Sequence, residues 1–407
     1  MQKHILDQID PKVLGARLAQ ARKARGMTQQ AVADEMEVAR TTLVAVEKGE
    51  RRVTPEELIG LAALYGRPVA EFVSKQVVTT GFVPQFRAEW LEDFRREEGL
   101  EKVGDELQRL AEDYVELERM CGIPSAKTYP PTYETTGSSP EQSAEEVAAA
   151  ERNRLGIGDG PISNVRDRLE TDVGLRIFYF AMPPKISGVF AYNDVLGGCV
   201  GINANHPRDR RNWSLAHEYG HFLTNRYRAE ITFLSEKKRQ SASERFADSF
   251  AENFLMPASG LNRRFTELHR SNPGGQITLA QLCTLADLYQ VSVQALIIRL
   301  EKLRRMPSGT WDRLESEGFK PRRAQQLLGI DANPDEQYLL PRRYLNLAVM
   351  AYEKELLSEG QLARFVRSDR VSARVLVEES SRRFNAEAEG DGYESFELDL
   401  AQTVPGR

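Results

Sequence analysis

The stretch "WSLAHEYGHFL" (213–223) places two histidines, His217 and His221, four positions apart, with a glutamate directly after the first. On an α-helix, residues i and i+4 share one face, so both imidazoles can occupy corners of a tetrahedral zinc site. Glu218 then points toward a metal-bound water and is expected to act as its general base. Apolar residues flank the motif, which predicts that the helix face opposite the histidines is buried. Such a short motif also occurs by chance, and the alternative is a partly exposed helix with two unrelated histidines.

A third ligand is expected from "SASERFADSFAENFLMP" (241–257), whose apolar residues recur at helical spacing. Glu244 and Asp248 lie one turn apart on another face of this helix. That spacing suits a carboxylate ligand, Glu244, and a second carboxylate, Asp248, that accepts the free N–H of a ligand histidine. The same residues also spell an S-x-x-E capping box, so the alternative is that Glu244 only caps the helix. Two other carboxylates compete as ligands, Glu236 and Glu252.

The N-terminal part, residues 11–75, predicts a compact group of short helices. Within 28–49, a short helix, a turn and a second helix beginning near Ala39 are typical of a helix-turn-helix, whose second helix enters the major groove of DNA. The side chains expected to contact DNA are polar or basic and lie at the starts of the two helices or just after them: Gln29, Arg40, Thr41, Thr42, Lys48 and Arg51. Residues 1–75 carry 12 Lys+Arg against 10 Asp+Glu, so a protein-interaction or dimer domain is the alternative.

The fold class expected for the whole chain is mainly α with a small β-sheet (α+β). We expect four pieces: the helix-turn-helix domain at 11–75, a helical connector and linker at 76–143, a second globular domain at 144–306, and a helical C-terminal region with an acidic tail at 307–407. Strands are expected in "GLRIFYFAM", "GVFAY" and "CVGINAN". "SGVFAYND" is a candidate edge strand for binding substrate backbone, because Gly188 allows a close approach. An ordinary hairpin strand is the alternative.

Composition sets broader limits. The 407 residues predict two or three domains, and the net charge of −5 gives no strong field toward nucleic acid or membrane. The three cysteines are far apart, which fits a reducing compartment. The first residues carry charges where a signal peptide is apolar, and no run approaches the roughly 20 apolar residues of a membrane span. A cytoplasmic protein with no membrane partner is therefore expected.

Residues 16–66 resemble the Xre/Cro-type helix-turn-helix family. In that family an arginine of the first helix pairs with a glutamate that ends the recognition helix. Arg22 and Glu47 hold these positions here, and we expect a buried or half-buried pair that fixes the angle between the helices.

The motif at 213–223, followed by "ERFADSFAENFLMP" (244–257), resembles the ImmA/IrrE family of zinc metallo-endopeptidases. The resemblance implies a zincin-like domain, Zn²⁺ as cofactor, and Glu244 as third ligand, since the family carries a glutamate 13 residues before the proline of its "LMP" ending. "FRAEWL" (86–91) and residues 340–366 also resemble members fused to an Xre domain. Two positions depart from the pattern: Tyr219 replaces a small aliphatic residue, and Phe246 stands where a second glutamate is frequent.

These features together favour a DNA-binding regulatory zinc endopeptidase. The resemblance implies a protein substrate such as a transcriptional repressor, and a homodimer is expected on DNA. The competing interpretation is an Xre-family transcription regulator whose metallopeptidase-like domain is a sensor or dimerisation module without proteolysis. Glu218 favours the protease, because a scaffold has no need of a general base.

Overall fold

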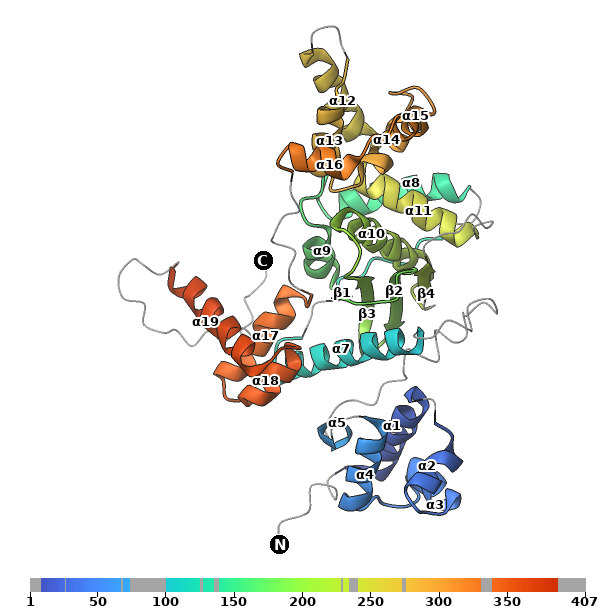
Figure 1. The fold of residues 1–407 in the computed structure, drawn as a ribbon, viewed down its shortest axis with the longest axis vertical. Coiled ribbons are helices and arrows are strands. Elements are labelled where there is room, and N and C mark those ends of the chain that lie inside the picture. Colours follow the sequence, from blue (N-terminus) through green and yellow to red (C-terminus); the bar gives the residue numbers. More distant parts are fainter. Residues whose placement is uncertain are drawn as a thin grey trace, which may run out of the picture. The chain divides into compact units, whose positions relative to one another are not determined.

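The computed structural model describes residues 9–25, 27–66, 69–73, 100–124, 127–134, 139–227, 230–233, 241–272, 276–330 and 339–386. The chain forms two compact units, Met1–Val83 with Phe94–Glu112, and Pro84–Asp93 with Asp113–Arg407. Helices and one small mixed sheet make up the described part, so the α+β fold class is confirmed (Figure 1). The "FRAEWL" stretch at 86–91 and the acidic tail beyond Ala386 lie outside the described residues.

Short helices, two of which have N-termini capped by a threonine side chain, build the N-terminal unit. Thr28 caps its helix by accepting from the Ala31 N–H, and Thr54 forms a reciprocal capping box with Glu57. Leu18, at the centre of the unit's hydrophobic core, is fully buried. The second helix of the expected helix-turn-helix begins at Arg40, as predicted. The helices are α1 (Pro11–Ala24), α2 (Gln29–Glu35), α3 (Arg40–Glu47), α4 (Pro55–Tyr65) and α5 (Val69–Val73).

A buried ion pair joins α1 to the end of α3. Arg22 donates from Nε to Glu47 Oε1 at 2.5 Å and from Nη2 to Oε2 at 3.0 Å, and the two side chains are only 9% and 6% exposed. Gln29 Nε2 donates to the same carboxylate at 2.8 Å. The buried pair expected from the sequence is confirmed. Its two parallel hydrogen bonds fix a direction as well as a distance, which holds α3 at a defined angle to α1.

A four-stranded mixed sheet lies in the second unit, in the order β1-β3-β2-β4. The expected hairpin is confirmed, with β2 antiparallel to β3, and β1 pairs with β3 in parallel. β4, which the sequence did not indicate, pairs with β2 on its other side. The edge-strand expectation for "SGVFAYND" was therefore wrong, because both sides of β2 are occupied. The strands are β1 (Arg176–Phe180), β2 (Ile186–Asn193), β3 (Gly197–Asn203) and β4 (Glu230–Phe233).

Helices cover one face of this sheet in two layers (Figure 1). α10 (Arg208–Asn225) packs on β2, β3 and β4, and α11 (Ala242–Leu255) packs on α10 and on α8 (Pro140–Arg154). α8 begins after the capping Ser139, a few residues before the domain start expected at 144. Before α8 in the chain, Tyr129 and Tyr133 are partly buried against the hydrophobic core. Both lie in the stretch predicted as a linker, so this part of that stretch packs on the second unit.

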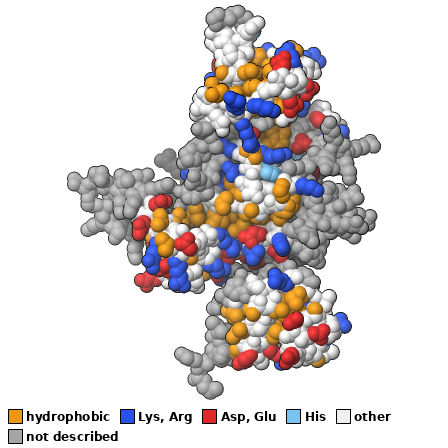
Figure 2. All heavy atoms as spheres, viewed as in Figure 1, with side chains coloured by type: hydrophobic (Ala, Val, Ile, Leu, Met, Phe, Trp, Pro, Cys, Tyr) orange, Lys and Arg blue, Asp and Glu red, His pale blue; other side chains and the backbone are white. Residues whose placement is uncertain are grey.

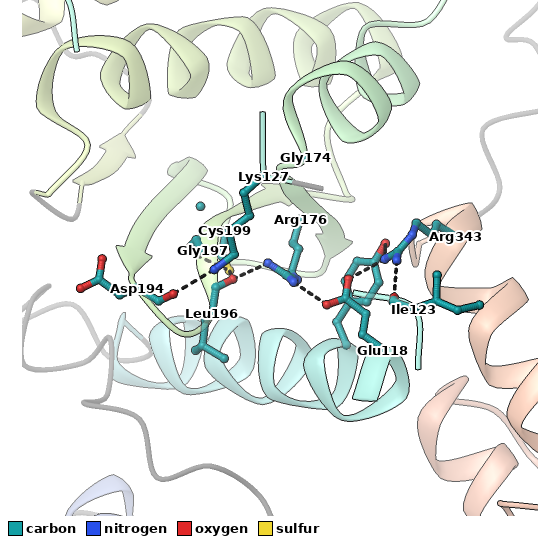
Figure 3. Close-up of polar contacts among 12 residues, drawn as sticks. Glu118, Ile123, Lys127, Gly174, Arg176, Asp194, Leu196, Gly197, Cys199 and Arg343 are labelled. Atoms are coloured by element: carbon teal, nitrogen blue, oxygen red, sulfur yellow. Dashed lines mark hydrogen bonds and ion pairs between the residues drawn. The ribbon is translucent and has the colours of Figure 1, made fainter. Parts of the chain in front are cut away.

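The other face of the sheet meets α7 (Leu100–Cys121), through residues that belong to the second unit. Arg176 on β1 donates to Glu118 Oε2 at 2.7 Å, and both side chains are almost fully buried. Arg343 on α17 (Arg342–Glu353) donates to the other oxygen of Glu118, Oε1. Figure 3 shows Glu118 between the two guanidinium groups. One carboxylate thus connects the connector helix, the sheet and the C-terminal helices.

The remaining helices extend the second unit. α13 (Leu279–Leu288) and α14 (Val293–Lys302) contribute Leu282, Leu296 and Ile297 to the hydrophobic core. No single described helix is long and apolar enough to cross a membrane, although α13 and α14, bent by 99° at their junction, pass that test as a pair. These elements are α9 (Val165–Arg168), a π-helical turn (Leu169–Val173), α12 (Ala258–Ser271), α13 (Leu279–Leu288), α14 (Val293–Lys302), α15 (Thr310–Ser316), α16 (Pro321–Leu327), α18 (Glu359–Phe365) and α19 (Arg370–Ala386).

Removal of the Glu118 carboxylate tests the connecting role of this network. Glu118→Ala leaves the buried Arg176 guanidinium without its counter-ion, and we expect the free energy of unfolding to fall by about 3–5 kcal/mol. Urea unfolding followed by tryptophan fluorescence measures this, since Trp213 and Trp311 both lie in the second unit. Glu267→Ala, which breaks an exposed pair with Arg264, should cost less than about 1 kcal/mol. Equal losses in the two variants would contradict the prediction.

Candidate metal centre

The helix that carries the histidine motif is buried through its central turns. Every residue from Ser214 to Leu223 is buried, and Glu218 and His221 have no exposed surface. The alternative of a partly exposed helix was therefore wrong. Burying two imidazoles and a carboxylate costs free energy unless each finds partners. The contacts of His217, His221 and Glu218 therefore indicate whether the helix can bind a metal ion.

Three potential ligand atoms from α10 and α11 meet at one point. His217 Nε2 lies 3.0 Å from His221 Nε2 and 3.4 Å from Glu244 Oε2, and His221 Nε2 lies 3.5 Å from Glu244 Oε1. Tetrahedral zinc with bonds of about 2.0–2.1 Å separates its ligand atoms by roughly 3.3–3.4 Å. The three side chains are the one group among the described residues that could hold a metal ion. Their spacing and their chemistry fit a divalent cation such as Zn²⁺.

Glu244 was expected as a metal ligand or only as a helix cap, and Glu252 was an alternative ligand. Ser241 Oγ accepts from the backbone N–H of Glu244 at 3.1 Å, so the cap uses the main chain and leaves the Glu244 carboxylate to the histidines. Glu252 instead pairs with Arg299 at 3.1 Å and with Lys302 at 2.7 Å. Glu236 lies outside the described residues.

Each histidine is oriented through its other ring nitrogen. Asp248 Oδ1 lies 2.8 Å from His217 Nδ1, the contact that the sequence suggested. His221 Nδ1 lies 3.3 Å from Ser243 Oγ, which also accepts from Asn225 at 3.1 Å. An N–H on each Nδ1 leaves the lone pair of each Nε2 directed at the common point. Sequence reasoning missed Ser243, although its place directly before Glu244 was a usable signal.

The charge balance of the group also favours a cation. Burial opposes a charged imidazole, but the hydrogen bonds with Asp248 and Glu244 prevail and raise the pKa of His217 to about 10. Burial likewise opposes a charged carboxylate, yet the hydrogen bonds with His217 and His221 hold the pKa of Glu244 well below its usual value. The carboxylates thus attract positive charge to the point where the three ligand atoms meet.

Glu218 reaches the sheet at a glycine. A Cβ atom built at Gly188 of β2 would lie 2.6 Å from Glu218 Oε1, closer than real Cβ contacts come. Any side chain at this position would have to displace the carboxylate from its place against β2. The sequence singled out Gly188 for the approach of a substrate backbone, whereas the structure shows that it accommodates the glutamate of the motif.

A hydrogen-bonded cluster fixes the opposite side of α10. Tyr219 donates its hydroxyl to Glu151 on α8, a fully buried carboxylate. Tyr133 donates to Glu151 at 2.8 Å, and Arg154 donates to both Glu151 and Tyr219. Tyr219 departs from the family pattern of a small aliphatic residue because its hydroxyl bonds to Glu151. The sequence did not indicate this role of Glu151. Phe246, the other departure, is buried and stacks on Phe250, so it belongs to the core.

The residues expected to contact DNA lie in the first unit around α2 and α3. Arg40 and Thr41 are exposed at the start of α3, and Thr42 is half-buried. Lys48 is exposed at its end. Arg51 pairs with Glu57 at 2.9 Å, and the amide of Gln29 is held by Glu47. Figure 2 shows acidic and basic side chains interspersed on the visible face of this unit, in keeping with its small net charge.

Variants of the proposed ligands test the metal centre. We expect Asp248→Ala to weaken zinc binding by about 10- to 100-fold, because His217 loses its orienting partner, and Glu244→Ala to weaken it further. Competition with a chelator measures the affinity. His206→Ala is the matched control, since His206 contacts the Pro184 carbonyl. Unchanged zinc affinity in Glu244→Ala would contradict this assignment.

Comparisons with known proteins agree with this geometry. Residues 18–72 match the family model for a helix-turn-helix, and residues 170–301 match the model for the IrrE N-terminal-like domain of the M78 peptidases. No curated protein matches the chain. The crystal structure of ComR from Streptococcus suis aligns over 93% of this chain and 96% of its own, at 12% identity and a TM-score of 0.16. The chain thus joins an Xre-type helix-turn-helix domain, typical of DNA-binding regulators, to an IrrE N-terminal-like domain of the metallopeptidase type.

Proposed function

We propose that this chain is a DNA-binding regulator that hydrolyses peptide bonds in a protein substrate. His217, His221 and Glu244 hold a zinc ion, and Glu218 is the general base. The observation that carries the proposal is the meeting of three ligand atoms beside a fully buried glutamate that follows the first histidine. A module that only senses or dimerises has no use for a carboxylate buried at that place.

Proton transfer is the chemical task of Glu218. A zinc ion held by His217, His221 and Glu244 would supply Lewis acidity toward the peptide carbonyl and the attacking water. Glu218 takes a proton from that water on a carboxylate oxygen and delivers it to the nitrogen of the leaving amine, so the C–N bond breaks as water is added. Gly188 supports this role, because its missing side chain lets the carboxylate lie against β2.

Orientation is the task of the surrounding residues. Asp248 and Ser243 hold the two imidazole rings through Nδ1. The Tyr219–Glu151 contact holds the back of the same helix against α8. Preorganised groups of this kind lower the cost of reaching the reacting geometry, because little has to move when substrate arrives.

Substrate backbone has a place at the edge of the sheet. β2 is paired on both sides, so β4 is the last strand in the order β1-β3-β2-β4. An extended polypeptide can add to such an edge with main-chain hydrogen bonds. Because α10 packs on β2 and β4, a chain bound there runs beside the helix that carries Glu218.

The helix-turn-helix domain gives the proposed protease its regulatory setting. We infer that α3 reads DNA in the major groove with Arg40 and Thr41 at its leading end. A transcriptional repressor is the protein substrate that this setting favours, since protease and substrate then meet at the same DNA.

A single-atom change at Glu218 tests the proposed chemistry. Glu218→Gln keeps the size of the side chain but cannot accept the proton, so we expect cleavage to fall by about 10²- to 10⁴-fold with zinc and DNA binding retained. Repressor-type proteins of the same cell, incubated with zinc-loaded wild type and analysed by mass spectrometry, give the readout. If wild type and Glu218→Gln yield the same fragments, Glu218 is not the base. If the wild type cleaves none of them, the non-proteolytic regulator is favoured.

Gly188→Ala provides a second variant that leaves every ligand in place. The added methyl group must displace the Glu218 carboxylate, and a shift of about 1 Å in a catalytic group can cost roughly 100-fold in rate. We expect zinc affinity to stay within a few-fold of wild type. Gly160→Ala is the matched control, because a Cβ there meets nothing within 4 Å.

Variants in α3 test the DNA-binding proposal separately. Arg40→Ala should weaken binding to a duplex selected from a random pool by about 1–3 kcal/mol, because an arginine contact to a base edge is lost. Fluorescence anisotropy at one fixed salt concentration measures the affinity. Arg270→Ala, an exposed arginine of the second unit, should leave it unchanged. Equal affinities for Arg40→Ala and wild type would exclude this role of Arg40.

A further inference from the structure

A cavity of about 1050 Å³ adjoins the metal centre in the second unit. Asp248 belongs to both places: its carboxylate holds His217 Nδ1 at 2.8 Å, and its side chain, 39% exposed, also lines the cavity. Four helices supply the wall, namely the first turns of α8 and α10, one face of α11, and one face of α14 along its whole length. The cavity is therefore built mainly from the elements that position the metal ligands.

The faces that carry the ligands continue into this cavity. His221 faces Glu244, and His217 faces both Glu244 and Asp248, so α10 and α11 run antiparallel. The next residues along these two faces are Trp213, four before His217, and Glu252, four after Asp248. Both line the cavity. One helical turn rises about 5.4 Å, and an extended chain advances about 3.3 Å per residue. The cavity thus begins one or two substrate residues away from the ligand atoms.

The lining suits a polypeptide with an apolar side chain. Trp213, Ala295 and Ile298 form an apolar wall that packs against the hydrophobic core. Five carboxylates and four basic side chains surround it, so charges of the two signs nearly balance. A phosphate-rich ligand would need an excess of basic groups, whereas a peptide presents a neutral backbone with side chains of either kind. Ligand pockets usually measure about 300–1,000 Å³, so this cavity has room for several residues.

We propose that this cavity is a substrate subsite, which receives a large apolar side chain of the polypeptide one or two residues from the scissile bond. The proposal rests on the proposed proteolytic function. In this proposal, Trp213 and Ile298 determine the preference of the site for a large apolar substrate side chain. It also predicts that binding at the cavity does not require the metal ion, because none of the three proposed ligands lines it.

Calorimetry on the full, metal-free chain tests this directly. The probes are two pentapeptides with blocked ends that differ only at the central residue, phenylalanine in one and serine in the other. We expect the phenylalanine peptide to bind at least tenfold more tightly. Ala295→Arg fills the cavity and should weaken its binding by tenfold or more, whereas Ala280→Arg, at an exposed position outside the cavity, should leave binding unchanged. Equal affinity for both peptides, or unchanged affinity in Ala295→Arg, would overturn the proposal.

Two further measurements separate folding and catalysis from the subsite. Gln294→Trp obstructs the same cavity from an exposed position, so it reports on the subsite even if Ala295→Arg unfolds, and we expect the same loss of binding. If zinc-loaded protein cleaves a substrate and Gln294→Trp leaves kcat/KM unchanged, the subsite is wrong while the protease stands. If the phenylalanine peptide binds in the cavity but no protein is cleaved, the protease is wrong, and the cavity is then a peptide-binding site without the catalytic role proposed for it.

Discussion

The antiparallel contact of α10 with α11 is the constraint on which the metal centre depends. Its register sets Asn225 beside Ser243, His221 beside Glu244, and His217 beside Asp248. A slip of one turn would move Glu244 by about 5.4 Å and separate it from the imidazoles. Close packing between the helices resists such a slip. A Cβ at Gly220, inside the histidine motif, would lie 3.2 Å from Phe250 and 3.3 Å from the Ala247 backbone, so the helices approach where a glycine allows it.

Two buried carboxylates of the second unit, Glu151 and Glu118, have partners that offset the cost of burial. The Glu151 carboxylate accepts from two tyrosines and an arginine behind the motif. On the far face of the sheet, Glu118 holds two arginines together. These networks add less net stability than their short distances suggest, because desolvation consumes most of the electrostatic gain. Their contribution is to select one arrangement of helices and sheet over others, which is what a site with convergent ligands requires.

Two different kinds of recognition meet in the proposed function. In the helix-turn-helix unit, the buried Arg22–Glu47 pair positions α3, and the proposal assigns DNA contacts to the exposed side chains at the start of that helix. In the second unit, the proposals place substrate backbone at the edge strand β4 and a substrate side chain in the cavity beside α11. A fold of either type serves many functions, and the functional argument therefore rests on the named side chains.

The sequence alone determined the local features of this protein. Helical spacing put His217 and His221 on one face, and runs of β-branched and aromatic residues predicted β1, β2 and β3. It also offered Glu244 and Asp248 as partners, through their one-turn spacing. Such signals are readable because they depend on residues within a turn or two of one another.

The tertiary structure decided what depends on contacts between distant segments. Glu151 supports the motif from 68 residues away in the chain, and β4 pairs with β2 across some 40 residues, which turned a supposed edge strand into an interior one. Ser243 became a partner of His221, and Gly188 a place for Glu218, only when helix and sheet packed together. No periodicity encodes these contacts, because which surfaces meet is set by the packing of the whole core rather than by neighbouring residues.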